Sequence, residues 1–531
     1  MGNKKTVYLV SNGDFRDSAG VVCWPKHQET LRAVQAAFKK LSVKTKVLPE
    51  FNPDRKHGFV TKQCEGAAIF AQIPPEAPVV IVLSCWAYAH HVCTCLKTHR
   101  GPIVLIANFD GTWPGLVALL NHAGTLDRLG VKYSRLWSKN FGDDPIFMKR
   151  LSHWVTAGSI SYKKDHLIDG RDLTLSRAAD HFGEKLAVDI LRYKRILGQL
   201  DPGCMGMLNA VMDLGNLAGI GMPLELLNQS DLLAEMELVS DEEATGHFDW
   251  LKGNNVWFDW GNNPDEQLTE AMVMSQMKMY SAAGRFVQRY GLAAIGIPYQ
   301  LGLVRCVPAS DLVEGMLNNE DRPIIVDPET GRAIRLNQAV PHFNEGDVGS
   351  GVPQILMHDI YKLKGMPTET TLHDVRYGKD YDGRFVWVFE ISGAAPPAHF
   401  GGWEKTKIYR QPKMYFPKGG GTCSGVSKPG TITWARFYES FGQIGMDCGI
   451  GEVIEMPDIE VKNRLDQTTN VWPIANVHIP GYDRDQLMAT HMSNHITIGY
   501  GDILPELIAT CLHLGIPTRV AGEAGQKLLA A

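Results

Sequence analysis

The chain has 531 residues, of which 44% are hydrophobic and 21% are charged, a length and composition typical of about three globular domains. Its formal net charge is -5 and it has no basic block, which argues against a nucleic acid as a partner. No apolar run approaches the ~20 residues of a membrane helix, no signal peptide precedes the first strand, and the cysteines are scattered, so we expect a cytoplasmic protein.

The first part of the chain alternates apolar strands with amphipathic helices. Strands are predicted at residues 7–10, 46–48, 79–83, 103–107 and 133–137, and helices at 28–41, 114–129 and 147–157. This alternation predicts a doubly wound parallel sheet, whose ligands bind at the carboxyl ends of the strands. Residues 12–16, 84–88 and 108–114 stand at those ends. The chain lacks a Gly-x-Gly-x-x-Gly after its first strand and a Gly-Lys-Ser/Thr loop, which argues against NAD and ATP.

A second α/β region begins near Ile168, with strands predicted at 195–200 and 292–299 and a long Met-rich helix at 266–290. The methionines recur at helical spacing, which favours a role in the core. After Gly346 the helix signals fade, and short β-rich runs separated by Gly and Pro take over at 385–391, 407–409, 431–436 and 452–456. These runs predict a β-rich, barrel-like domain that ends in a helix near residues 504–514.

A cluster of possible soft-metal ligands, His90, His91, Cys93 and Cys95, falls in the first region. At helical spacing these side chains do not share one face, so helix packing is the favoured interpretation.

Three polar residues outside this cluster could form a different site. Glu345 stands among small residues in the stretch 343–351, Asp374 stands at a predicted strand edge, and His495 ends a Ser-Asn-His tip before an apolar strand. Two carboxylates and one imidazole suit Mn²⁺ or Mg²⁺ better than zinc. Acidic residues at strand ends are more often simply solvated, so spacing alone leaves both interpretations open.

Six stretches that follow one another from near residue 80 to the C-terminus resemble motifs of the L-fucose isomerase family. They are Cys85-Trp-Ala-Tyr88, Asn108-Phe-Asp-Gly-Thr-Trp-Pro-Gly115, His373-Asp-Val-Arg376, Ile391-Ser-Gly-Ala-Ala395, Tyr415-Phe-Pro-Lys-Gly-Gly-Gly421, and Ser493-Asn-His495 with Thr497-Ile-Gly-Tyr-Gly501. Each motif is weakly specific alone, but their shared order makes the resemblance specific.

The resemblance implies a metal site and a sugar site. Glu345, Asp374 and His495 would bind Mn²⁺, with Mg²⁺ or Co²⁺ as other options, and the two carboxylates would also be catalytic. The sugar would be bound by four further residues, Arg16, Trp86, Gln300 and Asn494.

The resemblance also implies two N-terminal α/β domains, residues 1–165 and 166–345, and a C-terminal β-rich domain, residues 346–531. The second domain would carry Glu345, and the third would carry the other ligands. The expected assembly is a homo-hexamer with active sites at subunit interfaces. In such an assembly the aromatic residues Trp86, Tyr88 and Trp113, expected to be exposed at strand ends, would close the site of a neighbouring subunit.

The chain departs from the family pattern at several positions expected to surround the substrate. His491 replaces a tryptophan and Ile496 replaces a glycine, and the segment 403–412 is locally basic, with Lys405, Lys407 and Arg410. These departures put L-fucose itself in doubt.

We therefore predict an intramolecular oxidoreductase that interconverts an aldose and a ketose through an ene-diol, without an organic cofactor. One alternative is an isomerase for a different sugar, such as an anionic, sulfonated one. An alternative of another class is a non-catalytic carbohydrate-binding protein, although sugar binding needs no metal triad. A metal-dependent hydrolase would want a His-rich site that activates water, and the sequence offers none.

Overall fold

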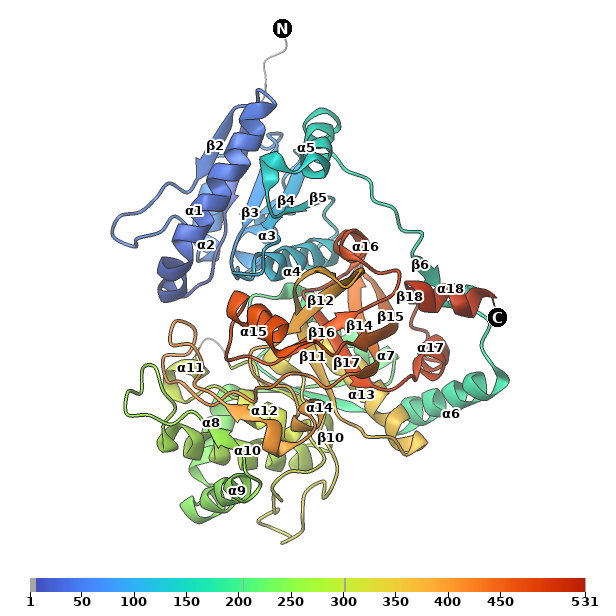
Figure 1. Cartoon of the computed structure of the whole chain (residues 1–531). Coiled ribbons are helices and arrows are strands. Elements are labelled where there is room, and N and C mark those ends of the chain that lie inside the picture. The colour runs from blue at the N-terminus through green and yellow to red at the C-terminus, as the bar shows by residue number, and fades with distance from the viewer. Residues whose placement is uncertain (1–5, 204, 300–301, 531) are drawn as a thin grey trace.

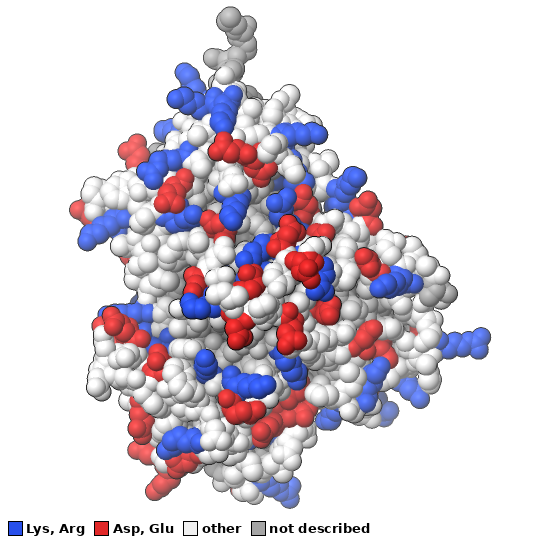
Figure 2. Space-filling model, in the orientation of Figure 1, with Lys and Arg blue, Asp and Glu red and all other residues white. Residues whose placement is uncertain are grey.

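The computed structural model describes residues 6–203, 205–299 and 302–530 (Figure 1). Two parallel sheets occupy the first part of the chain, and a larger, mostly antiparallel sheet contains the C-terminal strands. This arrangement confirms the mixed α/β class and the β-rich C-terminal region. On the face drawn in Figure 2, Lys and Arg side chains are interspersed with Asp and Glu. No helix among the described residues is long and apolar enough to cross a membrane.

The first sheet is parallel and has the strand order β2-β1-β3-β4-β5. Its strands are β1 (Val7–Ser11), β2 (Thr45–Leu48), β3 (Val79–Leu83), β4 (Ile103–Asn108) and β5 (Ser134–Ser138). All five lie within one or two residues of their predicted positions. Every residue of β3 is buried, because apolar clusters cover both faces of this sheet.

Helices pack on both sides of this sheet. They are α1 (Asp17–Lys40) and α5 (Pro145–Ala157) on one face, and α2 (Gln63–Phe70), α3 (His90–Leu96) and α4 (Gly115–Arg128) on the other. The helix α1 begins well before the predicted residue 28 and contains Pro25. Of the histidine and cysteine cluster, His91 and Cys93 are buried in α3 and Cys95 is partly buried.

A second, three-stranded parallel sheet has the order β10-β7-β8. Its strands are β7 (Ile196–Leu200), β8 (Leu224–Leu227) and β10 (Leu292–Gly296). The long helix α10 (Glu270–Arg289) packs against β10 and against α8 (Gln229–Glu237), α9 (Asp241–Gly253) and α12 (Asp311–Leu317). Met272, Met277 and Met279 of α10 are buried in the apolar core, as their spacing predicted.

The third sheet has the order β14-β17-β11-β12-β16-β15-β18-β6, and β14 also pairs with β15. The six strands from β14 to β15 therefore pair in a closed cycle. The strands are β6 (Leu167–Asp169), β11 (Thr370–Tyr381), β12 (Arg384–Glu390), β14 (Gly430–Ser440), β15 (Gln443–Val453), β16 (Ile474–His478), β17 (His495–Tyr500) and β18 (Thr518–Ala521). Although β6 comes from the predicted second domain, it pairs with β18, and α6 (Arg177–Tyr193) packs on α17 (Leu504–His513).

The expectation that helices fade after Gly346 is wrong. A buried helix, α13 (Val348–Lys364), begins almost at once, and α15 (Asp458–Gln467) and α16 (Arg484–Thr490) follow. Small residues at the start of α13 hide the helical pattern but permit close packing. A Cβ on Gly349 would lie 2.5 Å from Nη2 of Arg436, and one on Gly351 would lie 2.8 Å from the Phe343 ring.

Two helical glycines provide a test of this kind of close packing. A Cβ on Gly66 of α2 would lie 1.8 Å from the carbonyl oxygen of His91, whereas one on Gly246 of α9 meets nothing within 4 Å. We expect Gly66→Ala to lower the free energy of unfolding by about 1–3 kcal/mol, because the helices must separate. The matched control Gly246→Ala should raise it by up to about 1 kcal/mol, because alanine favours a helix. Chemical denaturation of both variants measures the difference, and equal effects would contradict the packing described here.

Candidate functional site

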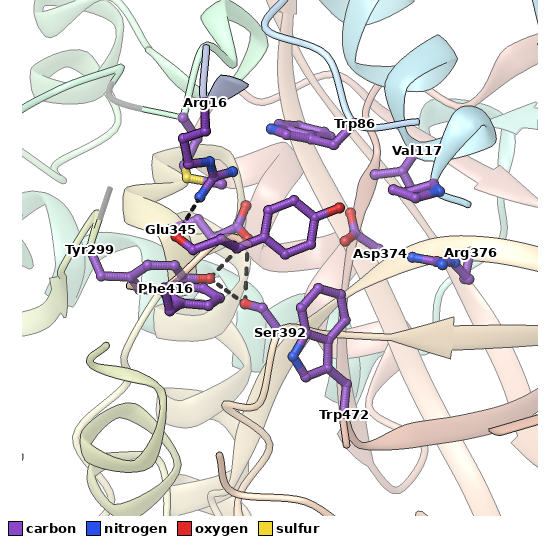
Figure 3. Close-up of a pocket in the computed structure, with 13 residues that line it drawn as sticks. Arg16, Trp86, Val117, Tyr299, Glu345, Asp374, Arg376, Ser392, Phe416 and Trp472 are labelled. Atoms are coloured by element: carbon purple, nitrogen blue, oxygen red, sulfur yellow. Dashed lines mark hydrogen bonds between the residues drawn. The ribbon is translucent and has the colours of Figure 1, made fainter. Parts of the chain in front are cut away.

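A pocket of about 440 Å³ lies where the first sheet meets the rest of the chain (Figure 3). It is lined by Arg16, Trp86, Pro114, Val117, Met205, Tyr299, Glu345, Asp374, Arg376, Ser392, Tyr415, Phe416 and Trp472. The first four follow the carboxyl ends of β1, β3 and β4, the position at which a parallel sheet of this kind binds its ligands.

The structure brings together the three residues predicted as metal ligands. Asp374 lies directly opposite His495 across the paired strands β11 and β17. Glu345 approaches from a short 3-10 turn, Asn344–Gly346, that precedes α13. The Nε2 atom of His495 lies 3.5 Å from Oε2 of Glu345 and 3.3 Å from Oδ1 of Asp374. Residues separated by 150 positions in the sequence thus meet, with Glu345 and Asp374 lining the pocket and His495 fully buried beside them.

The chemistry of these donors fits a divalent cation. The Nε2 atom of His495 is buried, has no hydrogen-bond partner among the described residues and faces two carboxylates. As the side chains stand, no group of three or more His, Cys, Asp and Glu within residues 6–203, 205–299 and 302–530 could hold a metal ion. The Nε2 atom of His495 instead contacts both carboxylates directly, so these side chains would have to reorient to bind an ion.

A buried ion pair orients His495 from behind. Its Nδ1 atom lies 2.7 Å from Oδ2 of Asp347, and Asp347 forms a salt bridge with Arg436. All three side chains are fully buried, and Arg436 also donates to Oγ of Ser350 at 2.9 Å. Such a carboxylate fixes the ring so that the other nitrogen faces the ligand position. Sequence reasoning missed Asp347, although it stands only two residues after Glu345.

The same contacts shift the ionisation of the site. Burial raises the pKa of Glu345 to about 7, with a further increase from Asp374 and an opposing effect from His495. Burial disfavours the charged ring of His495, but Asp347 and Asp374 outweigh it and raise its pKa to about 10. Burial also disfavours the charge of Asp347, yet Arg436 and His495 hold its pKa well below the usual range. A carboxyl that titrates near neutrality can both accept and donate a proton.

Glu345 is held in an unusual conformation. Its backbone has φ +59° and ψ 13°, in the left-handed region that few non-glycine residues adopt. Its Oε1 atom accepts a hydrogen bond from the Tyr299 hydroxyl at 3.1 Å and lies 3.4 Å from Oγ of Ser392 (Figure 3). The turn and the two hydroxyls together aim this carboxylate into the pocket.

The four predicted sugar-binding residues have different positions. Arg16 and Trp86 line the pocket. Arg16 is paired with Asp14 at 2.6 Å, and the indole Nε1 of Trp86 is a buried donor that has no hydrogen-bond partner in the part of the chain that the structure describes. Asn494 is fully buried and does not line the pocket, but its Nδ2 donates to Oδ1 of Asp374 at 3.1 Å. Gln300 lies outside the described residues.

The three aromatic residues expected to be exposed pack within their own chain. Trp86 and Tyr88 are 7% and 1% exposed and contact Met205 and Met207, whereas Trp113 is partly exposed and packs beside Cys85. The expectation of exposure is therefore wrong for Trp86 and Tyr88. Trp86 lines a pocket that Glu345 of the same chain also lines, so this pocket does not need a neighbouring subunit to bring them together.

The departures from the family pattern also lie away from the pocket. The ring of His491 is buried and its Nε2 lies 3.0 Å from the backbone oxygen of His495, while Ile496 is part of the apolar core. The side chain of Arg410 donates to the carbonyl oxygens of Pro264 and Gln411. Neither Lys405, Lys407 nor Arg410 lines the pocket, so the basic segment gives no support for an anionic substrate there.

No curated protein matches this chain. Among solved structures, it is similar to a periplasmic sugar binding protein of an ABC sugar transporter from Legionella pneumophila, at 9% identity. That similarity covers 69% of this chain and 99% of the other, with a TM-score of 0.15, too low to support an argument about the fold.

Residues 401–521 match the family model described as L-fucose isomerase, C-terminal domain. His495 lies inside the matched segment, whereas Glu345 and Asp374 precede it. The match supports membership of this chain in the L-fucose isomerase family and suggests that it is a sugar isomerase.

Proposed function

We propose that this chain is a metal-dependent isomerase that interconverts an aldose and a ketose through an ene-diol. The observation that carries the proposal is the meeting of Glu345 and Asp374, which line the pocket, with His495, which is buried beside them. The pocket is lined by aromatic and apolar side chains with a few polar groups, as small-molecule sites are, and the family match suggests a sugar as the ligand.

In this proposal Glu345, Asp374 and His495 hold a divalent ion, with Mn²⁺ as the first candidate and Mg²⁺ or Co²⁺ as alternatives. When bound, such an ion polarises a carbonyl and stabilises the negative charge that develops on the substrate oxygens. The buried Asp347 keeps Nε2 of His495 directed toward the two carboxylates.

Glu345 is the proposed acid–base residue. Its carboxylate takes a proton from the carbon next to the carbonyl and returns it to the neighbouring carbon, which requires a pKa near the working pH. Tyr299 and Ser392 hold its Oε1 atom, so the free oxygen points toward His495 and Asp374. Asp374, on the strand opposite His495, is positioned to assist from the other side.

The walls of the pocket favour an uncharged sugar. Trp86, Phe416 and Trp472 offer apolar faces on which a sugar ring can stack and which exclude water. Both guanidinium groups of the lining are already paired with carboxylates, Arg16 with Asp14 and Arg376 with Glu390. An anionic, sulfonated sugar would find no unpaired cation among the lining residues that the structure describes.

The direct test is turnover by the metal-loaded protein. We expect ketose formation from one or more members of a panel of pentoses, hexoses, deoxy-sugars and sulfo-sugars. Dialysis against EDTA should abolish it, and Mn²⁺ should restore it. Glu345→Gln, Asp374→Asn and His495→Ala should each lower kcat by at least about 100-fold, because each removes a charge or a ligand. Glu266→Gln, at an exposed position outside the pocket, is the control. Full activity in metal-free protein would refute metal dependence.

Removing the negative charge behind His495 is a more selective test. Asp347→Asn should weaken Mn²⁺ binding by about 10–100-fold, because the ring loses the partner that orients it. It should also destabilise the fold, because it leaves Arg436 buried without a counter-charge. Isothermal titration with Mn²⁺ and thermal unfolding measure the two effects. Unchanged Mn²⁺ affinity in the folded variant would show that Asp347 does not act on the site.

The position of Trp86 allows a test of where the site is built. We expect that mixing Trp86→Ala with His495→Ala, after proven subunit exchange, restores no activity, because both side chains belong to one chain's site. Sedimentation would establish whether the predicted homo-hexamer forms. Recovered activity would mean that neighbouring subunits share the site, as the family resemblance implies.

A further inference from the structure

Behind Glu345 lies a buried acid that neither the metal site nor the sugar site explains. Asp311 begins the helix α12, is fully buried and forms no salt bridge with any Lys, Arg or His that the structure describes. A buried carboxyl without a counter-charge is costly, so its hydrogen bonds must hold it in place. Burial raises the pKa of Asp311 well above its usual range, and Glu314 adds to this effect.

Both oxygens of Asp311 have well-defined partners. Oδ1 lies 3.1 Å from Oγ of Ser392, and Oδ2 accepts a hydrogen bond from Nε2 of Gln411 at 2.6 Å. Ser392 in turn contacts Oε1 of Glu345 and the Tyr299 hydroxyl. The acid is thus one residue removed from the proposed base.

Gln411 extends the network to Trp472, another residue of the pocket lining. Its Oε1 accepts a hydrogen bond from the indole Nε1 of Trp472 at 2.8 Å, while its Nε2 faces Asp311 and the backbone oxygen of Ser392. A flipped amide would set donor against donor at Trp472, so the orientation of Gln411 is fixed. One continuous path therefore joins Glu345 to the aromatic side chain of Trp472.

A second carboxylate in the first turn of α12, that of Glu314, holds the residue that precedes the proposed base Glu345. Glu314, three residues after Asp311, accepts a hydrogen bond from Nδ2 of Asn344. Asn344 immediately precedes Glu345, whose backbone lies in the left-handed region. Its Oδ1 also lies 3.3 Å from Oγ of Ser392. The first turn of α12 thus supports both the strained turn and the side chain of Glu345.

We propose that Asp311 and Gln411 are a positioning pair that sets the proton-transferring carboxylate of Glu345 in register with the sugar held against Trp472. The inference rests on the proposed isomerase function. The pair touches neither the pocket nor the proposed ligands, and acts only through Ser392, Tyr299 and Trp472. Misalignment of the reacting groups by about 1 Å can cost roughly 100-fold in rate.

Two substitutions at Asp311 separate positioning from folding. Asp311→Asn can give its carbonyl to Gln411 and its amide to Ser392, so it keeps both hydrogen bonds. Asp311→Leu has a similar size and keeps neither. We expect Asp311→Leu to lower kcat by about 10–100-fold while KM and Mn²⁺ affinity change little. Asp311→Asn should stay within about threefold of the wild-type kcat, since it preserves the geometry.

Breaking the pair from its other side provides a second test, which applies even if Asp311→Leu does not fold. Gln411→Met should lower kcat and also raise KM, because Trp472, which lines the pocket, loses the hydrogen bond from its indole Nε1 to Gln411. In the double variant, Asp311→Leu with Gln411→Met, kcat should be no lower than in the worse single variant, since both break one path.

Each outcome decides the inference. Unchanged kcat in folded Asp311→Leu or Gln411→Met would overturn it, and so would an equal loss in Asp311→Asn and Asp311→Leu. Additive losses in the double variant would likewise overturn it. The metal-loaded wild type is assayed first with the sugar panel. If the wild type forms no ketose, the proposed function is refuted, and the positioning pair with it. If the wild type is active, a change of kcat in the variants reports on Asp311 and Gln411 alone.

Discussion

The site depends on a buried charge chain that runs from Arg436 through Asp347 to His495. Arg436 lies in β14, Asp347 precedes α13 and His495 begins β17, so the chain ties a helix to two strands of the large sheet. In a low-dielectric interior each member would be costly alone, and together they satisfy one another. The orientation of His495, and with it the wall that Glu345 and Asp374 share, follows from this arrangement.

The packing of α13 supports the same row of buried charged side chains, Arg436, Asp347 and His495. Gly349 and Gly351 let the helix approach Arg436 and Phe343 more closely than a Cβ would permit, and Ser350 accepts a hydrogen bond from the Arg436 guanidinium. The short turn before the helix carries Glu345 in a strained backbone conformation. Strain of this kind persists only where the surroundings hold it, and here hydrogen bonds to Asn344 and Glu345 do so.

Much of the fold could be predicted, because local patterns determine it. The central strands of the first sheet, β1, β3 and β4, are mostly apolar, and helices separate the five strands, so the alternation of the two kinds of segment locates each strand within a residue or two. The helix α13 could not be found this way, because it is buried on nearly all sides and begins with glycines. The pairing of β6 with β18 joins residues about 350 positions apart, and no local pattern encodes that contact.

In the candidate site, too, motifs predicted which residues take part, but not where each side chain lies. Glu345, Asp374 and His495 were predicted from motifs, and the structure places them together. Asn494 belongs to the same motif as His495, yet it contacts Asp374 from behind the pocket wall, because successive residues at a strand start point in opposite directions.

What a motif cannot supply is the environment that sets reactivity. Burial, with a further contribution from Asp374, raises the pKa of Glu345 to about 7, and the carboxylates of Asp347 and Asp374 raise the pKa of His495. Asp347 and Asp374 create much of the environment of His495 from segments far from it in the sequence. A residue's identity therefore indicates the chemistry available, whereas its buried neighbours determine the protonation state and direction in which that chemistry can act.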